Sequence, residues 1–411
     1  MIKKLPNKKY EIVVVGGGMV GATFAISLSK ILESDCPPIL VVEAASVENQ
    51  EHSAPSYDAR STALSFGSRT ILENSGIWED LNEVVEPINE IQISDKGHFG
   101  STRLSCKEQN VDALGYVIEN SDLGAVLSAR LESSLAIDFF SSGEIRKASP
   151  TQNGMRLIID RGKVSYQVDA KLMVLADGGR SPICQQLGIQ KFLKNYEQRA
   201  IIANVSPQKP HKNIAFERFT PNGPFAMLPL RSFDEQNRCS MVCVANEQES
   251  EEIMQMTKGQ LIATLQEKFG SRLGKINHIG KRYDFPLKLS IAKEQVRPGL
   301  VLLGNVAHTL HPVAGQGMNL ALRDIHVLVN CLYRGIKRQI NPGDMSLLQG
   351  YIDERLFDHE KTISFTDNVV GLFSSNKASS IIGRKLGLIS LDLFPVLRKS
   401  FAVEAMGLIR K

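Results

Sequence analysis

Four glycines near the N-terminus have the spacing of a phosphate-binding loop. The segment Gly16-Gly17-Gly18-Met19-Val20-Gly21 fits the pattern GxGxxG. In such a loop the first glycine permits a tight turn, the second lets a pyrophosphate reach the backbone, and the third lets a helix pack closely on a strand. The N–H groups and partial positive charge of the following helix bind the phosphates. Glu43 lies where an acid would accept bonds from two ribose hydroxyls, so the pattern predicts a dinucleotide, either NAD or FAD.

Two later segments could complete such a site. Val174–Ser181 reads as an apolar strand that ends in an Asp177-Gly178 turn. Gly304–His308 follows another apolar strand and leads into the glycine-rich stretch His311–Asn319. Taken alone, each segment is as compatible with an ordinary turn as with part of a cofactor site. Their order and their distance from the glycine loop favour a single cofactor site.

The elements around these motifs predict an α/β fold. Short apolar runs at Glu11–Val15 and Ile39–Glu43 flank a helical pattern at Ala22–Leu32. This is a βαβ unit, the start of a doubly wound parallel sheet of Rossmann type. Similar apolar strands recur at Lys171–Ala176 and Gly299–Leu303.

A second region has the pattern of an antiparallel, β-rich domain, and the chain ends in a mainly helical region. The strands expected there are Ala200–Ser206, Asn213–Phe219, Cys239–Ala245 and His278–Phe285, with one helix at Glu251–Phe269. We expect a discontinuous nucleotide-binding domain at 1–78, 106–185 and 288–341, an inserted substrate domain at 79–105 and 186–287, and C-terminal helices at 342–411.

Composition narrows the class of protein. A chain of 411 residues is too long for one compact core, and a net charge of +4 is too small to argue for nucleic acid. The six cysteines lack metal-ligand spacing, and no metal site is expected. Buried free thiols would fit a reducing compartment, so we expect a cytoplasmic protein. The uncharged run Ile12–Ser29 mimics a signal peptide or membrane span, but the glycine loop explains it better.

All three motifs resemble those of the class A flavoprotein hydroxylases, the family of para-hydroxybenzoate hydroxylase. The resemblance implies an FAD-binding domain, NAD(P)H as a transient co-substrate and O2 as the source of the oxygen atom. It also implies a set of cofactor contacts. These are Gly16, Gly18, Met19, Val20, Gly21, Glu43, Arg60, Asn120, Asp177, Gly178, Asn305, Gly315, Gln316, Gly317, Met318 and Asn319.

Further segments narrow the resemblance to the ubiquinone-biosynthesis hydroxylases. These segments are Ile93–Gly100, Phe216–Thr220, Pro224–Pro229 and Arg272–Lys275. The implied reaction is ring hydroxylation of a prenylated phenol of the 2-octaprenyl-6-methoxyphenol type. Such a phenol is suitable because its oxygen activates the ortho and para carbons. The group also implies contact with a ubiquinone-biosynthesis assembly, and an oligomer is compatible with it.

Several individual residues keep two interpretations. His311, next to Pro312, and His308 could act as a base near the flavin, or could be hydrogen-bonded loop histidines. Phe219, Phe225 and Met227 could line a substrate pocket, which is the role expected for them here, or could belong to the core.

The sequence departs from the family pattern at two positions. Asn305 stands where family members usually have Asp, and Cys184 stands where they often have Arg. These departures keep open the possibility of a non-catalytic flavoprotein scaffold. A paralogous hydroxylase that acts at another ring position, or an FAD dehydrogenase or oxidase on the same fold, is also compatible with the motifs.

The C-terminal region has features of a membrane-surface segment. Leu386–Phe394 is largely apolar. Basic residues flank or follow it, namely Arg384, Lys385, Arg398, Lys399, Arg410 and Lys411. A hydrophobic prenylated substrate partitions into the bilayer, so we expect peripheral contact of the enzyme with the inner membrane. The same pattern also fits a helix packed on the protein itself or on a partner subunit.

Overall fold

The computed structural model describes residues 2–4, 9–45, 60–96, 101–221, 223–311, 315–373 and 395–408. Some sequence expectations lie outside these residues. They concern Pro312, the apolar run Leu386–Phe394, and the basic residues Arg384, Lys385, Arg410 and Lys411. Among the described residues, no helix is long and apolar enough to cross a membrane.

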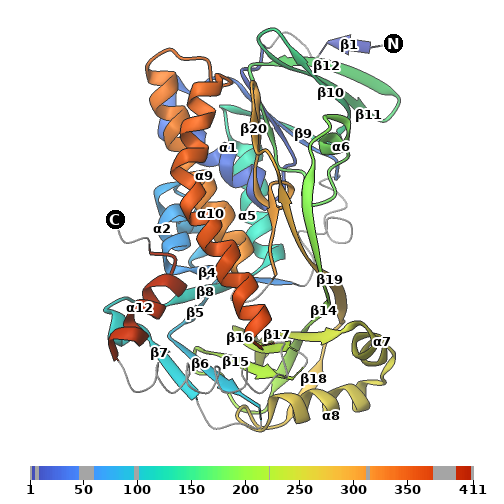
Figure 1. Ribbon diagram of the computed structural model, residues 1–411, viewed down its shortest axis with the longest axis vertical. Helices are drawn as coiled ribbons and strands as arrows, with labels where there is room; N and C mark the ends of the chain where they lie inside the picture. Colours follow the sequence, from blue (N-terminus) through green and yellow to red (C-terminus); the bar gives the residue numbers. More distant parts are fainter. Residues whose placement is uncertain are drawn as a thin grey trace.

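A six-stranded sheet forms the centre of one half of the molecule (Figure 1). Its strand order is β20 (Val296–Arg297), β21 (Leu300–Leu302), β13 (Leu172–Leu175), β2 (Ile12–Val15), β3 (Ile39–Glu43) and β9 (Ile137–Ser141). All neighbouring pairs are parallel except β20 and β21. The expected doubly wound parallel sheet is therefore confirmed.

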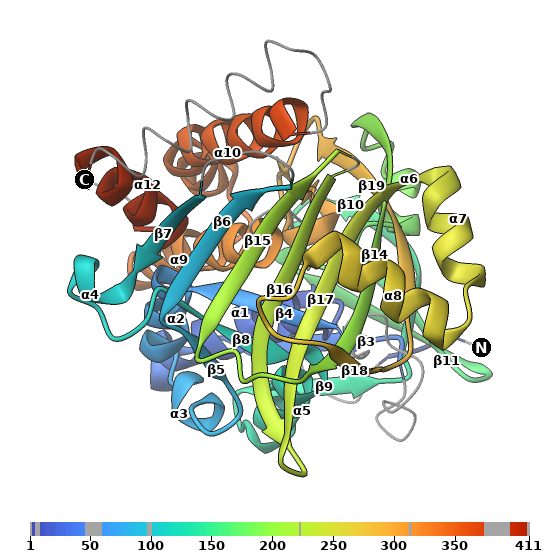
Figure 2. The same cartoon turned by 90° about the horizontal axis from the view of Figure 1, so that it is seen from below.

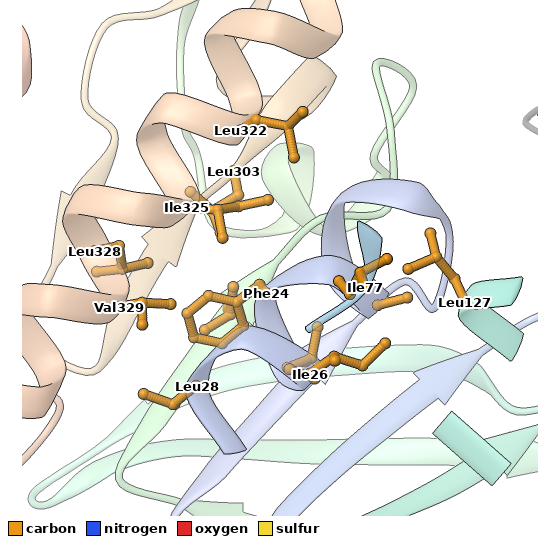
Figure 3. Packing of buried hydrophobic residues seen from close by; sticks show 14 of the residues in the cluster. Phe24, Ile26, Leu28, Ile77, Leu127, Leu303, Leu322, Ile325, Leu328 and Val329 are labelled. Atoms are coloured by element: carbon orange, nitrogen blue, oxygen red, sulfur yellow. The ribbon is translucent and has the colours of Figure 1, made fainter. Parts of the chain in front are cut away.

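Helices cover one face of this sheet. They are α1 (Met19–Leu32), α5 (Asn120–Ser133), α9 (Gln316–Lys337) and α10 (Met345–Phe373), and α10 packs along α9. Figure 3 shows Phe24 of α1 beside Ile325 and Val329 of α9. This apolar contact holds α1 against α9, and both helices begin at the predicted motifs.

A four-stranded sheet that the sequence did not reveal covers the other face. Its order is β1 (Ile2–Lys4), β12 (Val164–Ala170), β11 (Gly154–Arg161) and β10 (Glu144–Thr151). Side chains such as Leu157 and Ile159 pack with Val13 and Val15 of the parallel sheet, and the short helix α6 (Pro182–Gln186) lies against β10.

The second large sheet has nine strands. Along its main path the order is β22 (His308–Thr309), β19 (Tyr283–Ala292), β14 (Lys191–Pro207), β17 (Gln236–Asn246), β16 (Gly223–Phe233), β15 (Ile214–Thr220), β6 (Glu90–Asp95) and β7 (Ser101–Ser105), and β18 (Ile276–Ile279) pairs with β14. Figure 2 shows α7 (Glu247–Gln255) and α8 (Lys258–Phe269) on its outer face.

Two sequence expectations were wrong in this region. The single helix expected at Glu251–Phe269 is two helices, because Thr257 and Gln260 form a capping box that starts α8. The strand expected at His278–Phe285 is the end of β18 and the start of β19. Gly280 lies between the two strands.

A small sheet lies between the two large ones. It contains β4 (Ser61–Ser65), β8 (Gly115–Glu119) and β5 (Glu86–Ile88), and both β5 and β8 contact β16. Helix α2 (Phe66–Asn74) contacts β4 and β8, and α3 (Trp78–Leu81) packs on α2. Helix α4 (Cys106–Gln109) contacts β7 and α12 (Pro395–Ala405). Through β4 and β8, residues of the parallel-sheet half reach the inner face of the nine-stranded sheet.

The described part of the C-terminal region packs on the protein's own chain. Ala402 and Met406 are buried against Leu104 and Leu114, and the guanidinium of Arg398 pairs with Glu108. In this part of the tail, the helix therefore packs on the protein itself. All six cysteines are free thiols; Cys36 is half-buried and the other five are buried.

Candidate active site

The glycine loop has the backbone geometry that its pattern predicts. Gly16 has φ +101, a conformation that favours glycine, and its N–H donates to the carbonyl of Val42 at 2.8 Å. A Cβ at Gly21 would lie 1.9 Å from the carbonyl oxygen of Gly16. The first glycine therefore permits the turn, and the last lets α1 pack against the end of β2.

The N-terminus of α1 is open to a ligand. Gly18 occupies the N-cap position, and no side chain caps the first turn. The N–H groups of Met19, Val20 and Gly21 are therefore available for phosphate oxygens. Glu43 stands beside the loop, since its Oε2 accepts from the N–H of Gly17 at 2.7 Å and its Oε1 accepts from Ala45 at 2.9 Å. A carboxylate held this way keeps lone pairs for hydroxyl groups.

The fold brings the three sequence motifs together. A Cβ at Gly16 would lie 2.5 Å from the carbonyl oxygen of Ala176, directly before Asp177. A Cβ at Gly304 would lie 2.9 Å from Cγ2 of Val20. A Cβ at Gly179 would lie 3.8 Å from the carbonyl oxygen of Asn305. Segments far apart in sequence therefore meet at the carboxyl edge of the parallel strands, where such sheets bind nucleotides.

Asp177 and Cys184 occupy opposite ends of the Asp-Gly motif. Burial raises the pKa of Asp177 to about 6, although a hydrogen bond from Ser181 works in the other direction. Ser181 also caps α6 by accepting from the N–H of Cys184 at 3.2 Å. Cys184 is buried in the core, and burial raises the pKa of its thiol. The residue that replaces the family's usual arginine is therefore a packed side chain.

The N-terminus of α9 is also open. Gly315, the N-cap, has φ +60, and no side chain caps the helix. No described atom lies within 4 Å of a Cβ built on Gly317. Gln316 is buried, and Met318 packs on the main core. This turn can present backbone N–H groups to an anionic ring edge.

Asn319 is used internally. Its Oδ1 accepts from the N–H of Ser65 at 2.8 Å and from the hydroxyl of Ser68 at 2.7 Å. Its Nδ2 donates to the carbonyls of Ala63 at 3.0 Å and Gly315 at 2.8 Å. These four bonds occupy the whole amide, so the side chain ties α9 to β4 and holds the turn in place.

Arg60, Asn120 and Asn305 surround the same region. The guanidinium of Arg60 lies 4.8 Å from the centre of the Phe285 ring, on the nine-stranded sheet. Asn120 is buried; its N–H donates to the carbonyl of Arg60 at 2.8 Å, and its Oδ1 accepts from Thr62 at 2.7 Å. Asn305 is exposed, which leaves its amide accessible.

The two candidate histidines are both packed. His308 is buried, and its Nε2 lies 2.6 Å from Asp324 Oδ2. This contact favours a hydrogen-bonded histidine over a base near the flavin. His311 is fully buried, its ring lies edge-on to Tyr196 at 5.3 Å, and burial lowers its pKa to about 4. At neutral pH His311 is therefore uncharged.

Asp324 joins two helices through a buried charge cluster. Its carboxylate also pairs with Arg355 at 2.6 Å and lies 2.7 Å from His359 Nε2. Burial would raise the pKa of Asp324, but His308 and Arg355 hold it well below its usual range. His308, Asp324 and His359 have ligand atoms close enough for a metal ion. Because Arg355 already supplies a cation to this carboxylate, we interpret the cluster as a link between α9 and α10.

Two of the expected pocket residues face away from the cofactor motifs. Phe225 and Met227 are fully buried with Phe269 and Leu265 of α8, on the outer face of the nine-stranded sheet. Their assignment to a substrate pocket is corrected to core. Phe219 lies on the opposite, inner face, where it packs with Ile93. The alternation of apolar and polar side chains along a strand does not show which face of the sheet α7 and α8 cover.

Comparison with known proteins identifies the family. The sequence model of the FAD binding domain family matches residues 9–366, which is most of the chain. The chain is 30% identical to ubiquinone hydroxylase UbiL of Rhodospirillum rubrum, over 98% of this chain and 91% of that one. It belongs to the ubiquinone-hydroxylase group of FAD-binding class A monooxygenases. It is also 29% identical to 3-demethoxyubiquinol 3-hydroxylase of Escherichia coli, over 98% of this chain and all of that one.

The fold agrees with this membership. The structure of p-nitrophenol 4-monooxygenase PnpA from Pseudomonas putida superposes with a TM-score of 0.78 over 98% of this chain and 99% of that chain, at 15% identity. The protein is thus an FAD-dependent aromatic monooxygenase with the para-hydroxybenzoate hydroxylase-like fold. Enzymes of this class use FAD, NAD(P)H and O2. The uncapped starts of α1 and α9 and the placed Glu43 fit FAD.

Proposed function

We propose that this enzyme hydroxylates the aromatic ring of a polyprenyl phenol, with 2-octaprenyl-6-methoxyphenol as the expected substrate. The observation that carries the proposal is the likeness to ubiquinone hydroxylase UbiL over 98% of the chain, which includes the β-rich region as well as the cofactor motifs. A relative that shared only FAD binding would match the motifs without the sheet between them. Two of the segments that suggested this substrate type, Phe216–Thr220 and Pro224–Pro229, lie in that sheet.

We propose that FAD lies along the edge where the three motifs meet. Gly16, Gly18, Met19, Val20 and Gly21 would hold the pyrophosphate, Glu43 the ribose, and Asn305 the ribityl chain. The open turn at Gly315–Met318 would face the flavin ring, with Arg60 and Asn120 beside it and Asp177-Gly178 at the junction with the glycine loop. Asn319 would fix this turn through its four hydrogen bonds.

The division of the chain follows from these roles. We propose that 1–78, 106–185 and 288–341 bind FAD, that 79–105 and 186–287 bind the substrate, and that 342–411 supports both. The bound flavin supplies the redox chemistry that activates O2. The protein's own residues must orient the phenol and keep water from the reacting centre. Only one dinucleotide motif is present in the sequence, so NAD(P)H would bind transiently.

Gene deletion followed by mass analysis of quinone precursors tests the substrate. Loss of this enzyme should lead to accumulation of the phenol that it hydroxylates, and the wild-type gene should remove it. In vitro, the purified enzyme with NAD(P)H should convert that phenol to a product heavier by one oxygen atom. A product hydroxylated at another position would indicate the paralogous activity. Normal quinone production by a variant that binds no FAD would indicate a scaffold.

A further inference from the structure

The inner face of the nine-stranded sheet carries a row of accessible side chains. In β14 and β16 the odd-numbered side chains Ile201, Ala203, Phe225 and Met227 are buried under α7 and α8. The alternate positions Ile202, Ala226 and Val242 are only partly buried, although they lie in interior strands. Because neighbouring side chains of a strand point to opposite faces, these residues belong to the inner face.

The strand register adds one carboxyl group to this row. Glu217 of β15 pairs with Ala226, Ala226 with Val242, and Val242 with Ile202. Residues directly opposite in a ladder share a face, so the four form one line across the sheet. Neighbouring strands are about 4.8 Å apart, so the line from Glu217 to Ile202 is about 14 Å long. We call these four residues the accessible row.

The accessible row faces the cofactor half of the molecule. Asn204, one position along this face from Ile202, donates to Glu119 Oε1 at 3.2 Å. Glu119 is the last residue of β8 and directly precedes Asn120. On the other side of the row, Phe285 pairs with Ala200 and lies under the guanidinium of Arg60. Both contacts lie beside Ile202, so the Ile202 end of the row adjoins residues that we assign to the flavin region.

Glu217 is the only acid in this row, and the side chains opposite it on the neighbouring strands are apolar. Ile93 and Ala226 stand opposite it on the two adjacent strands. No hydrogen bond or ion pair joins its carboxyl to any of the described residues. Burial raises the pKa of Glu217 to about 7. An acid held in apolar surroundings is costly to the fold, and such sites often serve function.

Other charged or titratable groups lie on this face and on the elements packed around it. On the face itself, Asp95 of β6 is the next same-face residue after Ile93, and Tyr283 stands opposite Ile202 at the far end of the row. Arg238, which pairs with Glu119, lies two same-face positions from Val242. From α10, Asp367 binds Lys194 and Tyr196, and from α12, Arg398 binds Glu108. Glu217 supplies the carboxyl group on the row itself and is placed to receive a polar ligand atom.

We propose that the Glu217 carboxylate accepts a hydrogen bond from the ring hydroxyl of the phenol substrate, which lies flat along the accessible row. This inference rests on the proposed function. The apolar members of the row would contact the ring, and Glu217 would fix its rotation and so the carbon that is presented for hydroxylation. An ionised acceptor also increases electron density on the phenol oxygen, which activates the ring for attack by an electrophilic oxygen.

The test compares two ligands on three proteins. The ligands are 2-prenylphenol and its methyl ether, which differ only in the donor hydroxyl. The proteins are wild type, Glu217→Gln and Glu217→Leu, each with its FAD, and Glu267→Gln is the control for loss of an acid on the same sheet domain, because Glu267 is 81% exposed. Changes in flavin absorbance give each Kd, and turnover gives kcat/KM from pH 6 to 9.

Wild type should bind the phenol at least tenfold more tightly than the ether at pH 8. In Glu217→Leu this ratio should fall to about one, with FAD content unchanged. In wild type kcat/KM should rise with pH through about 7, and Glu217→Gln should lose this rise. Glu267→Gln should behave as wild type. Glu217 variants that keep the ligand ratio and the pH profile would overturn the inference, as would an equal loss for both ligands. Absence of turnover by wild type would instead contradict the proposed function.

Discussion

The two large sheets use their faces in different ways. Both faces of the six-stranded parallel sheet are buried, one under α1 and α9 and the other under the four-stranded sheet. Side chains of β2 and β3 therefore pack, and the chemistry lies in loops beyond the strand ends. The nine-stranded sheet buries its outer face under α7 and α8, whereas its inner face is buried only in part and carries the accessible row.

This difference separates two kinds of binding. A dinucleotide is held mainly by backbone N–H groups, which requires glycines and open helix starts at fixed spacing. A phenol must be held by side chains on a surface whose shape depends on what covers it. Substitutions at the glycine loop should therefore affect the cofactor, whereas substitutions in the nine-stranded sheet should affect stability or substrate according to the face.

The largest effect is expected at the glycine loop. Gly18→Val places a branched side chain where the pyrophosphate approaches the start of α1, so the protein should fold but purify without FAD. Gly259→Val is a suitable control, because a Cβ at Gly259 meets no described atom within 4 Å and this helix lies far from the motifs. The measurement is flavin absorbance per protein together with circular dichroism. A yellow Gly18→Val protein with stoichiometric FAD would contradict the assignment.

The next largest effect distinguishes the two faces of the nine-stranded sheet. Phe225 is fully buried beside Phe269, so Phe225→Ala should lower the free energy of unfolding by about 3–5 kcal/mol. Ile202 on the inner face is partly accessible, so Ile202→Ala should cost less, about 1 kcal/mol, and should weaken substrate binding instead. Urea unfolding of the two variants measures the difference. Equal losses of stability would remove the contrast between the faces.

The motifs of the parallel sheet were predictable because each acts over a few residues. Gly16 needs a positive φ and Gly21 needs the absence of a side chain, and both requirements leave a mark in the local sequence. The position of Phe225 was not predictable in the same way. Its strand alternates correctly, but the face that is buried depends on α7 and α8, which arrive from later in the chain.

Other errors had different origins. The helix expected at Glu251–Phe269 was divided by a local capping box, a signal that was present in Thr257 and Gln260 and could have been recognised. The hairpins of β10, β11 and β12 were missed inside a segment assigned only to the cofactor domain. Glu217 was also missed, because an acid in a strand attracts attention only when its apolar neighbours across the sheet are known.

A smaller effect is expected at Asn305. Its exposed amide lies beside the Asp-Gly motif, where we propose a contact with the ribityl chain. Asn305→Leu should leave polar partners unpaired in the complex and weaken FAD binding by about 1–3 kcal/mol. Asn305→Asp should retain FAD, because it restores the residue usual in the family. Titration of the apoproteins with FAD measures both values, and equal affinity of Asn305→Leu and wild type would exclude the contact.

The smallest effect concerns peripheral contact of the C-terminal region with a membrane surface. A polyprenyl phenol partitions into a bilayer, so we propose that basic residues of this region bring the enzyme to an anionic surface. Arg398 and Lys399 offer a matched pair on α12. Arg398 is held by Glu108 and is largely covered, whereas Lys399 is exposed.

Each basic residue near an anionic surface contributes roughly 1 kcal/mol. Lys399→Gln should therefore reduce flotation with anionic vesicles at low salt several-fold. Arg398→Gln should reduce it less, because the Arg398 charge is already paired, and should instead loosen α12 by about 0.2–1 kcal/mol. FAD content should be unchanged in both. Failure of wild type to float at low salt would exclude membrane contact, whereas equal flotation of wild type and Lys399→Gln would show that α12 does not face the lipid.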